Sequence, residues 1–305
     1  MVETVDIFVG TDRSQLLAVA VLEHSVQRHS SLPICVTPLI DLDLPEPRDI
    51  RQGSRTNFSF ARFAIPELKA YQGRAIYVDA DMLVFRDIAG LWNIPLDGAK
   101  IVIQEELPDT IVRHAKAGAP AQRKKQCAVM LIDCERARWH APDIIAGLDG
   151  DYTYEQLLGE MCILREEEVK YGVPFAWNSL EHHDSSTCLI HYTDMATQPW
   201  VSTQNRNALW WMLEVRLMLA KGALSWANVR REVDLGYFRP SLVKELEEMP
   251  HVRGWDNEAA RRYEALDKAA GYVKHAEVYS RKKARAEQVK RYEAELAAGR
   301  TAQAA

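Results

Sequence analysis

The chain has 305 residues, of which 47% are hydrophobic and 27% are charged, as in an ordinary soluble globular protein. Its formal net charge of −5 gives no basic excess, so we expect no nucleic-acid partner. The five cysteines are scattered without a CxxC pair, which argues against a zinc ribbon or a disulfide framework. The chain enters a strand-like run without the basic and apolar regions of a secretion signal, and no apolar run approaches the roughly 18 residues of a membrane span. We therefore expect a cytoplasmic protein.

Short apolar runs rich in β-branched residues alternate with segments of helical spacing over the first two thirds of the chain. The spacing predicts helices at 13–28 and 58–70. Strands are predicted at 5–10, 32–40, 75–80, 100–104, 127–133 and 188–192. This alternation predicts an α/β fold, with a mostly parallel, Rossmann-like mixed sheet flanked by helices. Ligands of such sheets bind beyond the carboxyl ends of the strands.

The composition changes near residue 204. The segments 206–233 and 239–249 read as amphipathic helices, and 256–297 is rich in Ala, Glu, Lys and Arg with a narrow apolar stripe. This last pattern predicts one long helix. We therefore expect a ligand-binding domain of residues 1–203 followed by a helical C-terminal extension of residues 204–305.

Two acidic residues end the third predicted strand. Asp79 and Asp81 follow the apolar residues AIYV, and residues two apart on an extended strand face the same side. Two such carboxylates suit a divalent cation such as Mg²⁺ or Mn²⁺, which prefers oxygen ligands and could also bind a diphosphate. The alternative is a turn in which Asp79 only caps the backbone.

A second apolar run ends in a polar residue much later in the chain. His191 closes the run CLIH, and a neutral imidazole can complete a Mn²⁺ site that two carboxylates begin. The alternative is a structural histidine. The two runs together predict a metal site formed by Asp79, Asp81 and His191.

Four stretches of this sequence resemble the GT-A glycosyltransferases, and among them family 8, which includes glycogenin and bacterial lipopolysaccharide galactosyl- and glucosyltransferases. They are VDIFVGTDRSQ, RTNFSFARFAIPEL, YQGRAIYVDADMLVFRDI and HYTDMATQPW. The resemblance covers roughly residues 4–202. It implies a GT-A fold, a nucleotide-sugar donor, and Mn²⁺ or Mg²⁺ held by Asp79, Asp81 and His191.

The resemblance also implies roles for further residues. The loop after the first strand, Gly10, Thr11 and Asp12, would cradle the base and the ribose. Arg62 would reach the nucleotide sugar, and Ala80 would lie against the ribose.

Four residues are implied to lie near the reacting sugar. Asn178 would lie near the acceptor together with Trp177, whereas Glu155 and Gln156 match a pair beside the donor sugar. If the reaction retains the configuration of the sugar, as the resemblance implies, the leaving phosphate can take the proton and no strong base is required. An inverting enzyme would use Glu155 or Asp184 as its base.

The last stretch departs from the family pattern. Gln198 stands before Pro199 where the family has a lysine that binds the diphosphate. Gln198 is therefore assigned to the donor site, and Arg13, Arg55 and Lys125 are candidates for the missing cation.

We predict a metal-dependent glycosyltransferase that moves a sugar, with a UDP-sugar as the expected donor, to a hydroxyl of a glycan or a glycolipid. A sugar nucleotidyltransferase is one alternative, disfavoured because VGTDRSQLL is not a glycine-rich loop. The other alternative is a non-catalytic scaffold with the GT-A fold.

The helical extension allows two interpretations. Its helices can pack on the domain and on each other, or they can form a homodimer or a contact with the inner membrane face. The second interpretation would use the basic stretch 281–291, because basic residues are attracted to anionic lipid. It would also use the large apolar side chains of 206–233, which are Trp210, Trp211, Met212, Leu217 and Met218.

Overall fold

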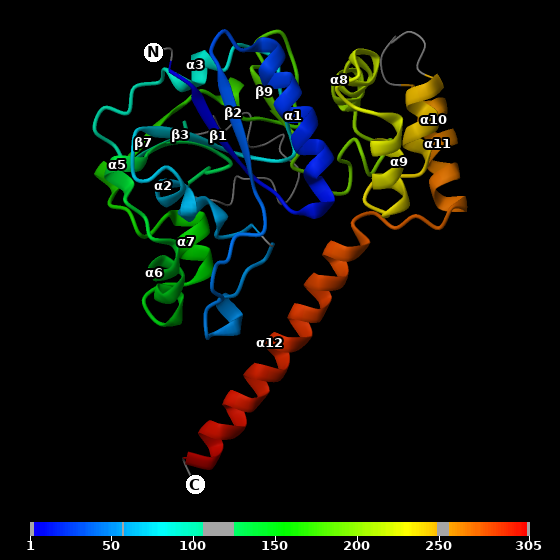
Figure 1. Cartoon of the computed structure of the whole chain (residues 1–305). Coiled ribbons are helices and arrows are strands. Elements are labelled where there is room, and N and C mark those ends of the chain that lie inside the picture. Colours follow the sequence, from blue (N-terminus) through cyan, green and yellow to red (C-terminus); the bar gives the residue numbers. More distant parts are fainter. Residues whose placement is uncertain (1–2, 57, 106–124, 249–255, 304–305) are drawn as a thin grey trace.

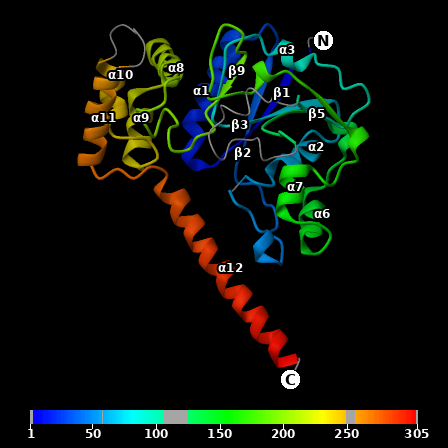
Figure 2. The same ribbon diagram turned by 180° about the vertical axis from the view of Figure 1, so that it is seen from behind.

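A computed structural model describes residues 3–56, 58–105, 125–248 and 256–303 (Figure 1). A sheet domain flanked by helices occupies one side of the molecule, and a group of C-terminal helices stands beside it. A long last helix leaves this group and passes beneath the sheet domain, as both views show (Figures 1 and 2).

In the described ranges, the main sheet has six strands in the order β2-β1-β3-β6-β5-β7. β6 is antiparallel to both of its neighbours and the other pairs are parallel, so the expected mostly parallel mixed sheet is confirmed. The strands are β1 (Val5–Gly10), β2 (Ile34–Leu39), β3 (Arg74–Asp79), β5 (Ile101–Gln104), β6 (Val129–Asp133) and β7 (Val169–Val173).

A small second sheet has the order β4-β9-β8, with β4 (Met82–Val84), β9 (Leu189–His191) and β8 (Ser179–Leu180). The predicted strand 188–192 is therefore correct, but it belongs to this second sheet. β4, β7 and β8 were not predicted, because β4 and β8 are very short and β7 carries polar residues.

Helices cover both faces of the main sheet. Phe8 and Tyr77 face a core shared with α2 (Ile65–Leu68), α5 (Cys134–Ala137), α6 (Ala141–Ala146) and α7 (Tyr154–Glu160). Ile7 and Val78 face the opposite core, shared with α1 (Leu16–His29) and α3 (Ala89–Trp92). Alternation of side chains along each strand thus buries both faces of the sheet.

The predicted helix 58–70 is shorter than expected. The segment forms a 3₁₀ turn, η3 (Ala61–Ala64), followed by the short α2. Ala70 and Tyr71 then adopt left-handed backbone angles, with φ of 50° and 58°, which ends the helix.

Two C-terminal segments that were each predicted as one helix each form two helices in the structure. The segment 206–233 forms α8 (Ala208–Lys221) and α9 (Trp226–Asp234), because Gly222 takes a left-handed conformation and Ser225 caps a new helix. The segment 256–297 forms α11 (Asn257–Ala269) and α12 (Ala276–Gln303), separated by Gly271 at φ 70°. The predicted helix 239–249 is α10 (Ser241–Glu248).

Helices α8–α10 share one hydrophobic core with α1, β4 and β9. Trp211, Met212 and Met218 are at most 3% exposed in this core. Their proposed role in a dimer or membrane contact is therefore wrong, because an intramolecular core already covers them. Trp210 is 36% exposed and Leu217 is partly buried.

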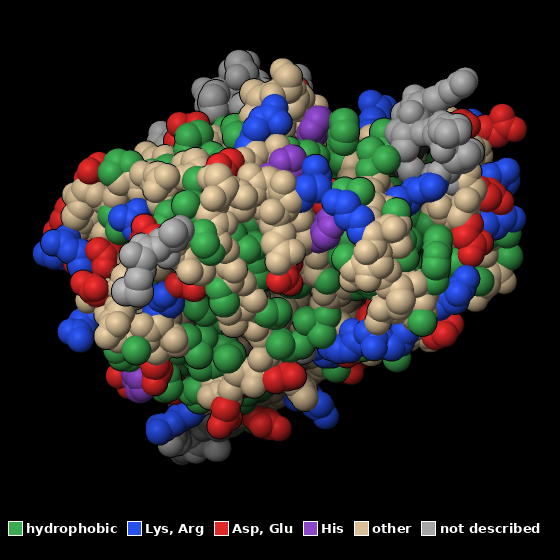
Figure 3. All heavy atoms as spheres, turned by 45° about the horizontal axis from the view of Figure 1, so that its top comes forward, with side chains coloured by type: hydrophobic (Ala, Val, Ile, Leu, Met, Phe, Trp, Pro, Cys, Tyr) green, Lys and Arg blue, Asp and Glu red, His purple; other side chains and the backbone are tan. Residues whose placement is uncertain are grey.

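The surface gives two further observations. None of the helices in the described ranges combines the length and the apolar character needed to cross a membrane. On the face in Figure 3, the described acidic and basic side chains are interspersed with hydrophobic ones and form no large patch of one charge.

A buried carboxylate joins the helical extension to the sheet domain. Glu214 of α8 is 3% exposed, and it accepts hydrogen bonds from two residues of α1. His24 Nδ1 lies 2.5 Å from Glu214 Oε1, and Arg28 Nη2 lies 2.8 Å from Glu214 Oε2. This pairing fixes α8 against α1.

Replacing Glu214 with Ala should lower the free energy of unfolding by about 2–3 kcal/mol, because it removes the hydrogen bonds from His24 and Arg28 that join α8 to α1, of which the one from Arg28 is charge-assisted. Urea denaturation followed by circular dichroism measures the change. The control is Gln27→Ala, an exposed position of α1 that should change the stability by less than about 0.5 kcal/mol. Equal stability of the two variants would contradict the structural role of Glu214.

Candidate metal centre

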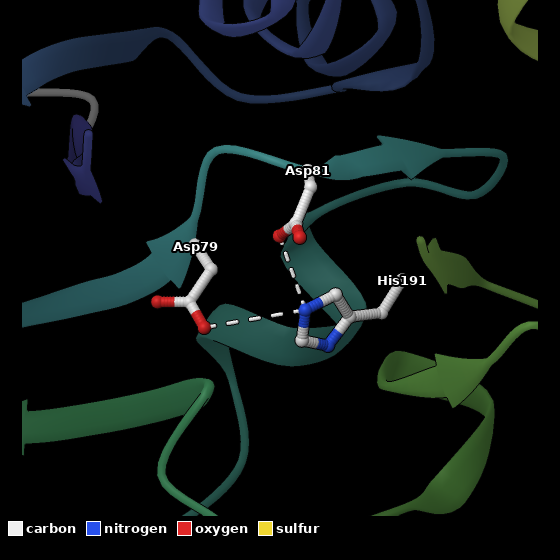
Figure 4. A group of neighbouring side chains, drawn as sticks. All are labelled: Asp79, Asp81 and His191. Atoms are coloured by element: carbon white, nitrogen blue, oxygen red, sulfur yellow. Dashed lines mark ion pairs between the residues drawn. The ribbon is translucent and has the colours of Figure 1, made fainter. Parts of the chain in front are cut away.

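Strand pairing brings Asp79, Asp81 and His191 together, although 110 positions separate Asp81 from His191. Asp79 ends β3, and Asp81 stands directly before β4. β4 pairs antiparallel with β9, with Met82 opposite His191, and the Tyr192 amide donates to the Asp81 carbonyl at 2.8 Å. The three side chains therefore point toward one another at the carboxyl end of β3 (Figure 4).

The ligand atoms of these three residues all lie within 4.8 Å of one another. His191 Nε2 is 3.1 Å from Asp81 Oδ1 and 4.0 Å from Asp79 Oδ2. Two carboxylates and one imidazole form a donor set that suits Mn²⁺ or Mg²⁺. The geometry fits the predicted metal ligands.

A buried amide pair orients the imidazole. His191 Nδ1 lies 2.9 Å from Asn178 Oδ1, and the Asn178 amide nitrogen donates to Gln104 Oε1. Since Asn178 Oδ1 is an acceptor, Nδ1 carries a proton, so Nε2 is the nitrogen that can give its lone pair to a cation held by the carboxylates. Asn178, predicted near the acceptor, is fully buried and contacts His191.

The carboxylates also set the protonation of His191. Burial is the largest single influence and lowers the pKa, but the neighbouring charges of Asp81 and Asp79 and the hydrogen bond to Asp81 raise it. The net effect is a pKa above the ordinary 6.5. Without a cation, the site therefore favours an imidazolium between two carboxylates.

Gln198 orients the second carboxylate. Its side-chain amide nitrogen donates to Asp81 Oδ2 at 2.8 Å and to the Tyr192 carbonyl at 3.2 Å. Gln198 is fully buried, and its Oε1 atom has no hydrogen-bond partner. The residue in place of the expected phosphate lysine thus contacts a predicted metal ligand.

A second buried network supports Asp79. The Tyr77 hydroxyl donates to Asp79 Oδ1 at 2.7 Å, and Arg62 donates to the Tyr77 hydroxyl at 3.0 Å. Burial raises the pKa of Tyr77 well above its usual value, so the phenol keeps its proton. A Cβ atom at Gly10 would overlap the Tyr77 hydroxyl, so Gly10 makes room for this network. The side chain of Arg62, which was predicted to reach the donor, is buried next to Tyr77 and Asp79.

The remaining residues predicted at the nucleotide are buried near the end of β1 and β3. Asp12 caps η1 (Arg13–Gln15) by accepting from the Ser14 amide at 2.9 Å, and the Thr11 hydroxyl donates to the Asp12 carbonyl. Ala80, which stands between Asp79 and Asp81 in the sequence, is 2% exposed and packs in the core shared with α1 and α3.

The predicted residues at the donor sugar lie in the first turn of α7. Gln156 forms a capping box with Thr153, and the exposed Glu155 pairs with Arg55 at 2.9 Å. Trp177, predicted near the acceptor, is buried in the core that α1 and α3 cover. The predicted roles of these three residues at the donor and the acceptor stay predictions.

The three cations proposed for the diphosphate have partners in the structure. Arg13 makes a bidentate pair with the buried Glu232, at 2.9 and 3.0 Å, and Lys125 pairs with Glu166 at 2.9 Å. Arg55 donates to Glu155 and to the carbonyls of residues 51 and 53.

Sequence reasoning missed Tyr77 and Gln104. Tyr77 could have been found, because it lies two residues before Asp79 on one strand and so faces the same side. The role of Gln104 depends on contacts between separate strands, for which the sequence gives no local pattern.

Solved structures support the same architecture. WbbM, described as a bifunctional glycosyltransferase, matches with a TM-score of 0.50 and 13% identity, over 70% of this chain and 49% of that one. The glycosyltransferase GlyE of Streptococcus pneumoniae matches with a TM-score of 0.50 and 15% identity, over 78% of this chain and 65% of that one. At such identities the likeness concerns the fold alone.

Sequence comparisons identify the family. The profile of glycosyl transferase family 8 matches residues 30–133, which include Asp79 and Asp81. Protein CDI of Arabidopsis thaliana is 31% identical over 213 residues, which are 67% of this chain and 78% of that protein. Probable galacturonosyltransferase-like 10 of the same plant is 29% identical over 136 residues, or 40% of this chain and 34% of that protein. The chain belongs to glycosyltransferase family 8, with the GT-A fold.

Proposed function

We propose that this protein transfers a sugar from a nucleoside-diphosphate sugar to a hydroxyl acceptor, with Mn²⁺ or Mg²⁺ held by Asp79, Asp81 and His191. The observation that carries the proposal is the convergence of these three side chains within 4.8 Å. Family membership favours a transferase over the alternative of a sugar nucleotidyltransferase. A scaffold without activity would not need the ordered partners of each ligand described above.

Each proposed ligand has a neighbour that holds it for the reaction. Asn178 fixes the ring of His191, Gln198 holds Asp81, and Tyr77 holds Asp79. A bound divalent cation would neutralise the negative charge that develops on the leaving diphosphate. The buried network thus places a preorganised charge site at the end of β3, where a sugar diphosphate of this family is expected.

The contacts of the two acids considered as a base for an inverting reaction, Glu155 and Asp184, favour a reaction that retains the sugar configuration. An inverting enzyme needs a carboxylate base, but Glu155 is exposed and paired with Arg55. Hydrogen bonds from Ser186 and His182 lower the pKa of Asp184, which makes it a weak base. Neither group is well suited to deprotonate an acceptor.

The donor and acceptor remain part of the proposal. UDP-sugars are the first donors to test, and the name of one relative adds UDP-galacturonic acid to the panel. A glycan or a glycolipid hydroxyl is the proposed acceptor.

Wild-type protein should be stabilised by one nucleotide sugar in a Mn²⁺-dependent way, because ligands that bind only the native state raise the melting temperature. Thermal-shift assays with UDP-, GDP- and ADP-sugars measure this effect. Asp81→Asn should abolish the Mn²⁺-dependent part, whereas the exposed control Asp43→Asn should preserve it. The proposal fails if no nucleotide sugar changes the melting temperature with metal present.

Asn178→Ala should weaken Mn²⁺ binding about 10–100-fold, because neighbours that orient a histidine ligand contribute on this scale. Electron paramagnetic resonance of free Mn²⁺ during a titration gives the dissociation constant directly. The control is Asn93→Ala, at an exposed position after α3, which should bind Mn²⁺ like the wild type. Wild-type affinity in Asn178→Ala would remove its positioning role.

Mn²⁺ affinity should rise with pH above 6.5, because the metal must displace the proton from His191, whose pKa is raised above that value. Below this pKa the dissociation constant should change by about tenfold per pH unit. His29, His183 and His275 have pKa values lowered by burial, so their titration lies below this window. The same dissociation constant at pH 6 and pH 8 would contradict His191 as a ligand.

A further inference from the structure

A cavity lies between α12 and the loop 46–56, next to Asp12 at the end of β1. Its volume is about 350 Å³, within the roughly 300–1,000 Å³ that small-molecule sites occupy. Among the described lining residues, four are basic and two are acidic. They are Arg55, Arg281, Lys282, Arg285, Asp12 and Glu46.

Contacts at several points hold α12 against this loop. Arg285 donates to the carbonyl oxygens of residues 50, 51 and 53, at 2.9–3.3 Å. The guanidinium of Arg51 lies over the ring of Tyr292, 5.9 Å from its centre. Arg281 pairs with Asp12 at 3.6 Å. The first half of α12 is thus one wall of the cavity, and it passes beneath the sheet domain in both ribbon views (Figures 1 and 2).

The beginning of α12 also contacts the segment that follows His191. His275 Nε2 lies 2.8 Å from the Met195 carbonyl, and Lys282 Nζ lies 3.9 Å from the Met195 sulfur. The charges of Asp12 and Asp81 both oppose the burial that lowers the pKa of His275. The contacts with Met195 join the start of α12 to the segment between His191 and Gln198.

Lys282 retains capacity to bind an anion, and Arg281 retains one unpartnered nitrogen, although its Nη2 atom pairs with Asp12 at 3.6 Å and with Glu277 at 3.4 Å. Among the described contacts, Lys282 has the sulfur of Met195 and the ring of Tyr279, 5.7 Å away, but no oxygen acceptor. The Nε atom of Arg281 is buried and has no hydrogen-bond partner. Arg55 and Arg285, by contrast, already donate to backbone carbonyls.

We propose that α12 forms a wall of the donor site, where Lys282 and Arg281 bind the phosphates of the nucleoside diphosphate. The inference rests on the proposed function, since it places the phosphates between the end of β1 and the metal centre. A cation from the helical extension then takes the place of the lysine that Gln198 replaces. It also explains why Arg13, Arg55 and Lys125 can be engaged elsewhere.

Lys282→Ala tests the inference in the whole 305-residue chain, because Lys282 has few contacts that could affect folding. Isothermal titration calorimetry with Mn²⁺ present should measure UDP and uridine, and GDP and guanosine, for wild type and variant. Loss of the ammonium should weaken the affinity for the nucleoside diphosphate roughly 10-fold. The affinity for the nucleoside should not change, because only the diphosphate carries the negative charge. The difference should shrink at high salt.

Lys283→Ala is the matched control, since Lys283 is exposed on the same helix but does not line the cavity. It should bind like the wild type. If wild type binds a nucleoside diphosphate and Lys282→Ala binds it equally well, the inference is wrong and the proposed function stands. If wild type binds none of the four compounds, the proposed function fails and the inference falls with it. Equal weakening of the nucleoside and its diphosphate would also overturn the phosphate contact.

Discussion

The short pairing of β4 with β9 is the contact on which the rest of the site depends. It brings Met82 opposite His191 and so places the imidazole beside Asp81. The pairing is itself secured by the core that α1, β4 and β9 share with the C-terminal helices. The helical extension therefore supports the candidate metal centre through this core, although none of its described residues belongs to the group of Asp79, Asp81 and His191.

The metal centre is surrounded by buried groups that each restrain one ligand atom. Such restraint has a cost, because buried polar atoms such as Gln198 Oε1 and Gln104 Nε2 lack partners. The Tyr77 hydroxyl restrains Asp79, and Arg62 in turn donates to this hydroxyl. A site of this kind changes shape little when charge develops, which is the property that electrostatic stabilisation of a leaving group requires.

Local patterns in the sequence predicted those features that depend on neighbouring residues. The buried strands β1, β3 and β6 follow from their apolar runs, and the ligands stood out because polar residues end such runs. Predictions of single helices failed where one residue changes the path of the chain, as Gly222 and Gly271 do. The contact between Asn178 and Gln104 depends on distant strands, for which the sequence has no local pattern. Trp211 and Met218 were misread, because exposure depends on packing that composition does not specify.

The contacts of α12 also have a consequence for the order in which the protein is completed on the ribosome. The hydrogen bonds of Arg285 join residues 232–235 positions apart, so they form among the last contacts of the described chain. His191 emerges well before α12, and the metal ligands can therefore assemble while one side of the neighbouring cavity is still open. In a nascent chain the three side chains can thus come together before α12 contacts the loop 46–56.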